Sequence, residues 1–276
     1  MISSQEIAQP VREPQLAGLP GNQRGATRGT LPDQPKRPQR SGWHRWGGRF
    51  GLRFAIYGSL LAGMFPAIWP AWDQSIATWF FTTGRGFPLQ DSPLVQFVYV
   101  GIPWLSRAAV VFLLIGIVVS WRLRQRRWLQ GFACALLALA IGPGLLINGL
   151  LKEQVGRARP EQVSQFGGTR VFAGALRPSD QCQHNCAFVS GHAAVGFWFA
   201  VGYAVSRRRQ RTWLGVATLA GAVVGLARMA AGGHWLSDVI FSMSFTLMGV
   251  GLAYWLAYRP GLRWRLAKAR WRNRRN

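Results

Sequence analysis

The sequence predicts an all-α, polytopic membrane protein: a bundle of about six transmembrane helices with both termini in the cytoplasm. Of its 276 residues 49% are hydrophobic and only 15% are charged, and the hydrophobic residues gather in long runs, which is typical of membrane proteins. The net charge of +24 would suit a nucleic-acid partner. No nucleic acid is expected, however, because the basic residues stand in short clusters between the apolar runs.

Each apolar run has the length of a helix that crosses the hydrocarbon core, which takes about 20 residues. Helices are favoured because a backbone in lipid has to satisfy its own hydrogen bonds. The run that starts near Cys186 is the least typical, because Ser190, Gly191 and His192 stand in its first turns. The expected segments are 51–71, 98–121, 128–151, 186–205, 212–231 and 236–258.

These segments divide the chain into three parts. Residues 1–48 are rich in Pro, Gly, Gln and Arg, and have too few large apolar residues to fold alone, so a disordered basic arm is expected. Residues 49–260 form the six-helix membrane domain. Residues 261–276 form a basic cytoplasmic tail that lies near anionic headgroups and anchors the topology.

Basic residues set the orientation of the bundle. Of the 33 Lys and Arg, 25 lie in the arm through Arg53, in the connections 122–127 and 207–211, and in the tail from Arg259. All four clusters fall on one side of a six-helix arrangement. By the positive-inside rule that side is the cytoplasm, and the other side of a bacterial inner membrane is the periplasm.

A second group of polar residues collects at the opposite ends of four expected helices. Ionisable groups cost at least ~2.5 kcal/mol each near the centre of a membrane helix, so a concentration of them indicates a function. The topology was derived from other residues, so this clustering is an independent observation. The candidate site residues are Lys152, Arg159, Ser190, Gly191, His192, Arg228, His234 and Asp238.

These residue types suit the handling of an anion together with proton transfer. Lysine and arginine bind phosphate, and amides at a helix N-terminus, here those of Gly191 and His192, would point at the same anion. His234 and Asp238 are four residues apart and share one helix face. The carboxylate can hold one ring nitrogen and leave the other free to attack, while His192 acts as the opposing acid. This chemistry needs no metal and no cofactor.

Each residue also has a purely structural interpretation. Lys152 can snorkel from a helix end, the Ser-Gly-His run can be a helix cap, and Arg228 can neutralise Asp238. The functional interpretation is preferred because all the structural ones would have to coincide at one face. Four charged residues of the long loop are interpreted as solvated: Glu153, Arg157, Arg170 and Arg177.

Three motifs decide between these interpretations. They are KEQVGRARP at 152–160, FVSGHAA at 188–194 and ARMAAGGHWLSD at 227–238. Together they resemble the signature of the type 2 phosphatidic acid phosphatase family, K-x6-R-P, P-S-G-H and S-R-x5-H-x3-D. Val189 stands where the family has Pro, and Ala227 stands where it has Ser, which removes one possible hydroxyl donor to phosphate.

The resemblance implies a metal-independent lipid phosphatase. His234 would be the nucleophile that forms a phosphohistidine, Asp238 its orienting carboxylate, and His192 the acid that protonates the leaving alcohol. The phosphate cradle would consist of Lys152, Arg159, Ser190, Gly191 and Arg228.

The implied substrate is a membrane lipid phosphate. The run from Cys186 to His192 is similar to the second motif of some bacterial lipid A phosphatases, so lipid A is favoured. Undecaprenyl pyrophosphate, phosphatidylglycerophosphate and phosphatidic acid are the alternatives. The sequence makes no prediction of oligomeric state.

Other functional classes stay open at this point. A lipid phosphotransferase would use the same phosphohistidine, and a vanadium haloperoxidase shares the motifs but does not fit six membrane spans. A transporter is disfavoured because its polar residues would lie near the membrane midplane.

The three cysteines form no disulfide scaffold. Cys134 is expected to be buried in an apolar run. Cys182 and Cys186 lie on the non-cytoplasmic side, in an oxidising compartment, and are expected to form a small disulfide before the fourth segment.

Overall fold

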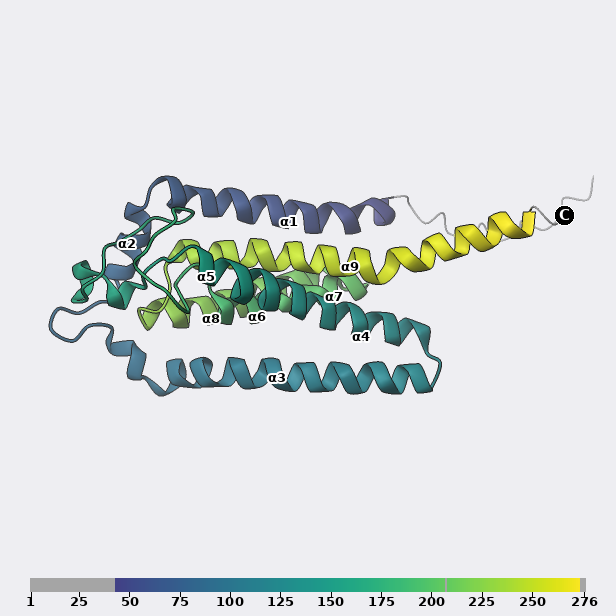
Figure 1. The fold of residues 1–276 in the computed structure, drawn as a ribbon, viewed down its shortest axis with the longest axis horizontal. Coiled ribbons are helices and arrows are strands. Elements are labelled where there is room, and N and C mark those ends of the chain that lie inside the picture. Colours follow the sequence, from purple (N-terminus) through teal and green to yellow (C-terminus); the bar gives the residue numbers. More distant parts are fainter. Residues whose placement is uncertain (1–42, 207, 274–276) are drawn as a thin grey trace, which may run out of the picture. The chain divides into compact units, whose positions relative to one another are not determined.

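The structure is a computed structural model and describes residues 43–206 and 208–273. Within this part of the chain the regular structure is helical, without named strands, so the predicted fold class is confirmed (Figure 1). Most of the expected basic arm lies outside the described residues, and its last residues, from Trp43, already belong to the first helix. The end of the expected tail, from residue 274, lies outside them as well.

The described helices, in chain order, are α1 (Trp43–Ile68), α2 (Ala71–Thr78), η1 (Pro88–Asp91), α3 (Pro93–Arg122), α4 (Arg126–Leu139), η2 (Ala140–Leu151), α5 (Lys152–Gln154), η3 (Pro160–Gln162), η4 (Ser164–Phe166), α6 (Gly191–Phe197), η5 (Trp198–Ala200), α7 (Val201–Val205), α8 (Gln210–Ala230) and α9 (Leu236–Asn273). Most are α-helices; η2 is a π-helix and the other η elements are 3₁₀ turns.

Five helical segments of the described chain are long and apolar enough to cross a membrane: 51–68, 93–122, 126–154, 210–230 and 236–258. The sixth apolar segment, α6 through α7, covers only residues 191–205. It starts five residues later than predicted because Ser190 caps the helix and the residues before it belong to the long loop. At about 1.5 Å per residue it is about 22 Å long, shorter than the hydrocarbon core.

Helix α9 is the central element of the bundle. Half of its membrane segment is buried, and it packs against α1, α4, η2, α6 and α8, whereas only 6% of the α3 segment is buried (Figure 1). Small residues allow these close approaches. A Cβ atom on Gly249 would come within 2.6 Å of the Gly142 backbone, and one on Gly196 within 2.7 Å of Gly221. Packing of small residues is a general way to bring membrane helices together.

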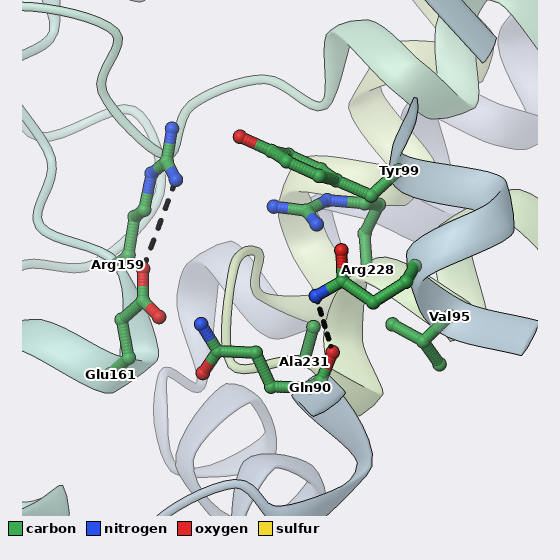
Figure 2. A pocket seen from close by; sticks show the side chains of 8 residues that line it. Gln90, Val95, Tyr99, Arg159, Glu161, Arg228 and Ala231 are labelled. Carbon is green, nitrogen blue, oxygen red and sulfur yellow. Dashed lines mark hydrogen bonds and ion pairs between the residues drawn. The ribbon is translucent and has the colours of Figure 1, made fainter. Parts of the chain in front are cut away.

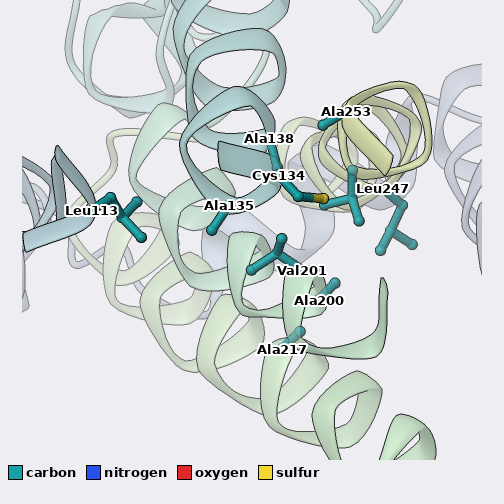
Figure 3. Packing of buried hydrophobic residues seen from close by; sticks show 10 residues of the cluster. Leu113, Cys134, Ala135, Ala138, Ala200, Val201, Ala217, Leu247 and Ala253 are labelled. Atoms are coloured by element: carbon teal, nitrogen blue, oxygen red, sulfur yellow. The ribbon is translucent and has the colours of Figure 1, made fainter. Parts of the chain in front are cut away.

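A core of small and aliphatic side chains fills the space between α4, α7, α8 and α9 (Figure 3). Cys134 is completely buried in it, as predicted. Its buried members are Leu113, Cys134, Ala135, Ala138, Ala200, Val201, Ala217, Leu247, Val250 and Ala253. This core holds the helices that carry the polar site at their other ends.

An aromatic cluster covers the end of the bundle where the polar residues lie. Phe87 and Phe166 from the loops pack at 5.5 Å, and Phe172 contacts Trp235 at 4.8 Å between ring centroids. The Trp235 indole also donates a hydrogen bond to the Ala158 carbonyl at 2.9 Å. The long loop between α5 and α6 is therefore fixed on the start of α9, although it has little regular structure.

Candidate active site

The structure places all eight predicted site residues at the same end of the helices. Lys152 begins α5, Arg159 follows in the loop, and Arg228 lies in the last turn of α8. Ser190 caps α6, and its amide donates to the Asp238 carbonyl oxygen at 3.3 Å, which ties the start of α6 to the start of α9. The Ser190 carbonyl accepts a second bond, from the Ser242 hydroxyl at 2.8 Å.

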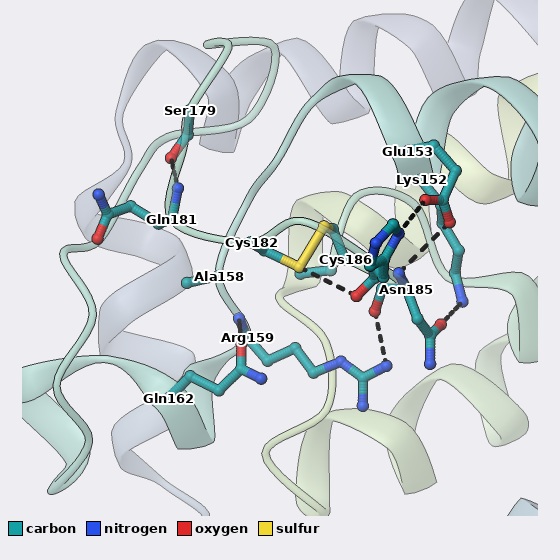
Figure 4. The surroundings of a disulfide bond; sticks show 12 residues. Lys152, Glu153, Ala158, Arg159, Gln162, Ser179, Gln181, Cys182, Asn185 and Cys186 are labelled. Carbon is teal, nitrogen blue, oxygen red and sulfur yellow. Dashed lines mark hydrogen bonds and ion pairs between the residues drawn. A yellow bond between two sulfur atoms is a disulfide. The ribbon is translucent and has the colours of Figure 1, made fainter.

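One asparagine joins the first two cations of the site (Figure 4). The Lys152 ammonium donates to Asn185 Oδ1 at 2.6 Å, and an Arg159 guanidinium nitrogen donates to the Asn185 backbone carbonyl at 2.8 Å. Lys152 is only 8% exposed. Asn185 was not predicted as a site residue. Its backbone has a φ of +51°, a conformation that asparagine tolerates better than most residues.

The predicted disulfide between Cys182 and Cys186 is present and encloses Asn185. Glu153 supports the same turn, because it accepts from the Asn185 amide at 3.4 Å and lies 3.3 Å from the His184 ring. Glu153 is exposed, as predicted for a solvated loop charge, and in addition contacts this turn. The loop closed by the disulfide therefore positions Lys152 and Arg159 through Asn185.

A side chain at Gly191 would require Asn148 to move. A Cβ atom there would come within 2.6 Å of Asn148 Oδ1. The Asn148 amide donates to the Pro143 carbonyl at 2.7 Å, inside the π-helix η2. The glycine thus lets the N-terminus of α6 lie directly against η2, next to the basic residues at its end.

His192 is half-buried and lies against Tyr99 of α3. The two rings are stacked, with centroids 5.4 Å apart, and His192 Nε2 is 3.1 Å from the Tyr99 carbonyl oxygen. A carbonyl can only accept a hydrogen bond, so Nε2 carries a proton in this arrangement. Tyr99 was not predicted, because nothing in the sequence indicates which face of the second segment meets the site.

His234 is 98% buried and is held by a carbonyl group. Its Nδ1 donates to the Ala187 carbonyl at 2.7 Å, which leaves Nε2 with a free lone pair. The Asp238 carboxylate is 3.8 Å from Nδ1, too far for a hydrogen bond. The direct orienting bond expected from Asp238 is thus made by Ala187. Burial lowers the pKa of His234 from 6.5 to about 4, so the ring is neutral at pH 7.

Arg157 explains why Asp238 does not reach His234. This arginine is completely buried and donates to Asp238 at 2.5 Å, to Asp73 at 2.7 Å and to the Ser237 hydroxyl at 2.8 Å. Its Nε donates to the Ala173 carbonyl at 2.8 Å. The interpretation of Arg157 as a solvated loop charge was therefore wrong, and so was the alternative in which Arg228 neutralises Asp238.

Asp73 comes from α2, in a connection to which the sequence assigned no function. Both of its oxygens are used: Oδ1 accepts from the Ser237 amide at 2.9 Å, and Oδ2 accepts from Arg157 and the Ser237 hydroxyl. Burial raises the pKa of Asp73, and the nearby Arg157 charge opposes that rise. Asp73, Arg157 and Asp238, hereafter the buried charge network, connect α2, the long loop and α9.

Arg228 is 6% exposed, and its guanidinium lies 4.6 Å from the centre of the Tyr99 ring. Its Nε has no hydrogen-bond partner among the described residues. Arg228 and Arg159 both line a cavity of about 150 Å³ (Figure 2). The two other loop arginines, Arg170 and Arg177, are exposed as predicted.

A buried neutral imidazole with one free nitrogen, close enough to Lys152 and Arg228 to interact with their charges, can attack an electrophilic phosphorus. The described residues contain no group of three or more His, Cys, Asp and Glu side chains that could hold a metal ion. Metal independence stays a prediction.

Residues 131–262 match the PAP2 superfamily. A lipid A 4'-phosphatase of Francisella tularensis subsp. novicida is 31% identical over 228 residues, which cover 76% of this chain and 97% of that protein. The chain belongs to the PAP2 superfamily. This confirms the predicted type 2 phosphatidic acid phosphatase family and, with it, the assignment of the chain as a lipid phosphatase.

Other relatives match a smaller part of the chain. A lipid A 4'-phosphatase of Rhizobium etli is 32% identical over 168 residues, which cover 56% of this chain and 62% of that protein. A lipid A 1-phosphatase of Rhizobium johnstonii is 33% identical over 149 residues, which cover 53% of this chain and 57% of that protein. No solved structure matches the chain.

Proposed function

We propose that this protein removes a phosphate from lipid A through a phosphohistidine intermediate, without a metal ion, at the periplasmic face of the bacterial inner membrane. The observation that carries the proposal is His234, whose Nδ1 is engaged by Ala187 and whose Nε2 keeps a lone pair. A neutral imidazole fixed by one nitrogen is a competent nucleophile. The cations that surround it supply the electrostatic stabilisation that phosphoryl transfer needs.

The reaction has two steps. In the first, His234 Nε2 attacks the phosphorus, the bond to the lipid oxygen breaks, and His192 gives its Nε2 proton to that oxygen. For this step His192 starts as the imidazolium, and its Nε2 proton leaves the bond to the Tyr99 carbonyl, so that the ring ends the step neutral. In the second, water attacks the phosphohistidine, His192 takes a proton from it, and inorganic phosphate leaves.

Lys152, Arg159 and Arg228 would neutralise the phosphate oxygens in both steps, together with Ser190 and the Gly191 amide. Arg228 Nε has no hydrogen-bond partner within residues 43–206 and 208–273 and would gain one from the substrate. Asp238 acts indirectly in this scheme. It fixes the first turn of α9 by accepting from the Trp235 amide at 2.8 Å, and its charge lies 3.8 Å from the His234 ring that carries the phosphate.

Lipid A is favoured as substrate because three relatives named lipid A 4'-phosphatase match 76%, 59% and 56% of this chain. The 4'-phosphate is therefore the first position to test. The periplasmic location is supported by the clusters of Lys and Arg at the other ends of the helices, and by the disulfide, which forms in an oxidising compartment.

The proposal is tested by phosphate release from purified protein in detergent with EDTA present. The lipids are lipid A, undecaprenyl pyrophosphate, phosphatidylglycerophosphate and phosphatidic acid, and mass spectrometry identifies the position that lost its phosphate. We expect release from lipid A that persists in EDTA and disappears in His234→Ala. Gln165→Ala is the control, because that side chain is exposed in the long loop and lies outside the cradle.

Three results would contradict the proposal. Inhibition by EDTA with recovery on adding a metal would remove metal independence. Transfer of phosphate to a second lipid without release would indicate a phosphotransferase. No turnover of any lipid by folded protein would favour a non-catalytic role such as transport.

A further inference from the structure

The cavity next to the phosphate cradle contains groups that phosphate binding does not require (Figure 2). It is lined by the cradle residues Arg159 and Arg228, and also by Gln90, Gln96, Tyr99 and Glu161. Four elements contribute to it: η1, the first turns of α3, the loop at η3, and the end of α8. A site for phosphate alone would be expected to hold donors and cations only.

Glu161 is the clearest exception. Its carboxylate is 3.8 Å from an Arg159 guanidinium nitrogen and its side chain is 31% exposed. A carboxylate beside the cradle repels a phosphate and competes with it for Arg159. The same carboxylate can accept hydrogen bonds from hydroxyl or amide groups. A bound molecule that carries such donors next to its phosphate would offset this repulsion.

The two glutamines provide further polar groups on the opposite wall. Gln96 donates from Nε2 to the Gln90 backbone carbonyl at 2.8 Å, so its own side-chain oxygen stays available as an acceptor. The Gln90 side chain is exposed and offers both a donor and an acceptor. A carboxylate, two amides and the face of Tyr99 form a surface that is complementary to a ring bearing several hydroxyl or amide groups.

Arg228 supplies this wall with a donor that a bound molecule would satisfy. It is 94% buried, lines the cavity, and its Nε has no partner among the described residues. A buried donor without a partner costs about 1–3 kcal/mol, more when it is charged. A ligand oxygen in the cavity would remove that cost.

The volume of the cavity and the residues beside it limit which ligand can enter. The cavity volume of about 150 Å³ is below the ~300 Å³ at which drug-sized ligands begin to fit, so it holds one ring and not a whole lipid headgroup. Beside it on α3, Leu94 and Phe97 are 74% and 75% exposed, which suits contact with acyl chains. The ring would enter the cavity while its chains stay in the bilayer.

We propose that this cavity is the subsite for the sugar ring that carries the scissile phosphate, so that its ligand class is a phosphorylated hexose or hexosamine. The inference rests on the proposed lipid A phosphatase function and adds the residues that select its substrate. Glu161, Gln90 and Gln96 recognise ring hydroxyl or amide groups, and Arg159 and Arg228 connect that ring to the phosphate. Phosphatidic acid, whose glycerol hydroxyls are esterified, offers the subsite no such donors.

The test compares two substrates in two variants. Glu161→Ala removes the carboxylate that accepts hydrogen bonds from the sugar ring and also removes its repulsion of the phosphate. The KM for lipid A should therefore rise about tenfold, whereas the KM for phosphatidic acid should fall or stay unchanged. Gln90→Ala, an exposed position where folding is not at risk, should raise KM for lipid A alone. Asp180→Asn and Gln165→Ala are the controls, because both side chains are exposed in the same loop and outside the cavity.

Binding of soluble probes separates this inference from the function itself. Glucosamine phosphate should stabilise the His234→Ala protein against thermal unfolding more than glycerol 3-phosphate does, and Glu161→Ala should remove the difference. Equal binding of the two probes, or equal KM changes for both lipids, would overturn the sugar subsite even if phosphate release is normal. Selective binding without release from any lipid would instead contradict the proposed function and leave the subsite supported.

Discussion

Arg157 offers the sharpest test of how the active site is held together. Replacing it by Met keeps much of its length and its contact with Trp235, whose ring centre is 5.2 Å from the guanidinium. The replacement leaves Asp73 and Asp238, which are 1% and 0% exposed, as two buried carboxylates without their shared cation. Removing one partner of a buried ion pair costs about 3–5 kcal/mol, because the remaining charge is uncompensated.

We therefore expect Arg157→Met to lower the unfolding temperature in detergent by roughly 6–20 °C, at about 2–4 °C per kcal/mol for a chain of this size. Activity should fall as well, because His234 lies two residues before the first turn of α9. Asp73→Asn removes the negative charge that pairs with Arg157 and should cost about 1.5–3 kcal/mol for the loss of that charge-assisted bond. In a double-mutant cycle with Arg157→Met, the two effects should be far from additive.

Arg170→Met is the matched control, since that arginine is exposed. Surface substitutions usually change stability by less than about 0.5 kcal/mol. If Arg157→Met behaves like Arg170→Met in unfolding and in activity, the buried charge network does not support the site and the reasoning fails. Additive effects in the double mutant would show that Arg157 and Asp73 act independently.

Three further predictions concern the reaction. Rapid quenching without acid during turnover of ³²P-labelled lipid should trap a phosphoprotein that is stable in base and labile in acid. His234→Ala should lose this label, and its kcat should fall by at least about 10³-fold. A label that persists in the variant would place the nucleophile elsewhere. Because the pKa of His234 is lowered to about 4, the acid limb of the kcat/KM profile should lie near pH 4 and not near pH 6.5. The free energy of unfolding should be constant above pH 6.5 and decline as pH falls from 6.5 towards 4, where the unfolded chain binds the additional proton. A limb at pH 6.5 that mutation assigns to His234 would contradict the burial of this ring. A reductant should raise the KM of the wild type several-fold, because opening the disulfide releases Asn185 from its contacts with Lys152 and Arg159. Asn185→Ala should reproduce that increase, and a Cys182→Ser/Cys186→Ser double variant should be insensitive to reductant. An unchanged KM in all three would show that the two cations do not depend on Asn185 for their position.

Much of this protein could be predicted from its sequence. Long apolar runs require helices in lipid, so the number and approximate position of the segments followed from hydrophobicity alone. The motif spacings place Lys152, Ser190, Arg228 and His234 at helix ends, and the alternation of the chain across the membrane brings such ends to one side. The Cys182–Cys186 pairing was also predictable, because the residues are close in sequence and on the oxidising side.

What only the tertiary structure decided is how those residues are held. Arg157 looked like an ordinary loop charge because its partners, Asp73 and Asp238, are more than 80 residues away in sequence. The same reason hides the Ala187 carbonyl that holds His234, and the Tyr99 ring between His192 and Arg228. Helix formation and membrane insertion depend on local composition, which a sequence displays directly. Burial of a charge and the partner that compensates it depend on which distant segments pack together, and only the folded chain determines that.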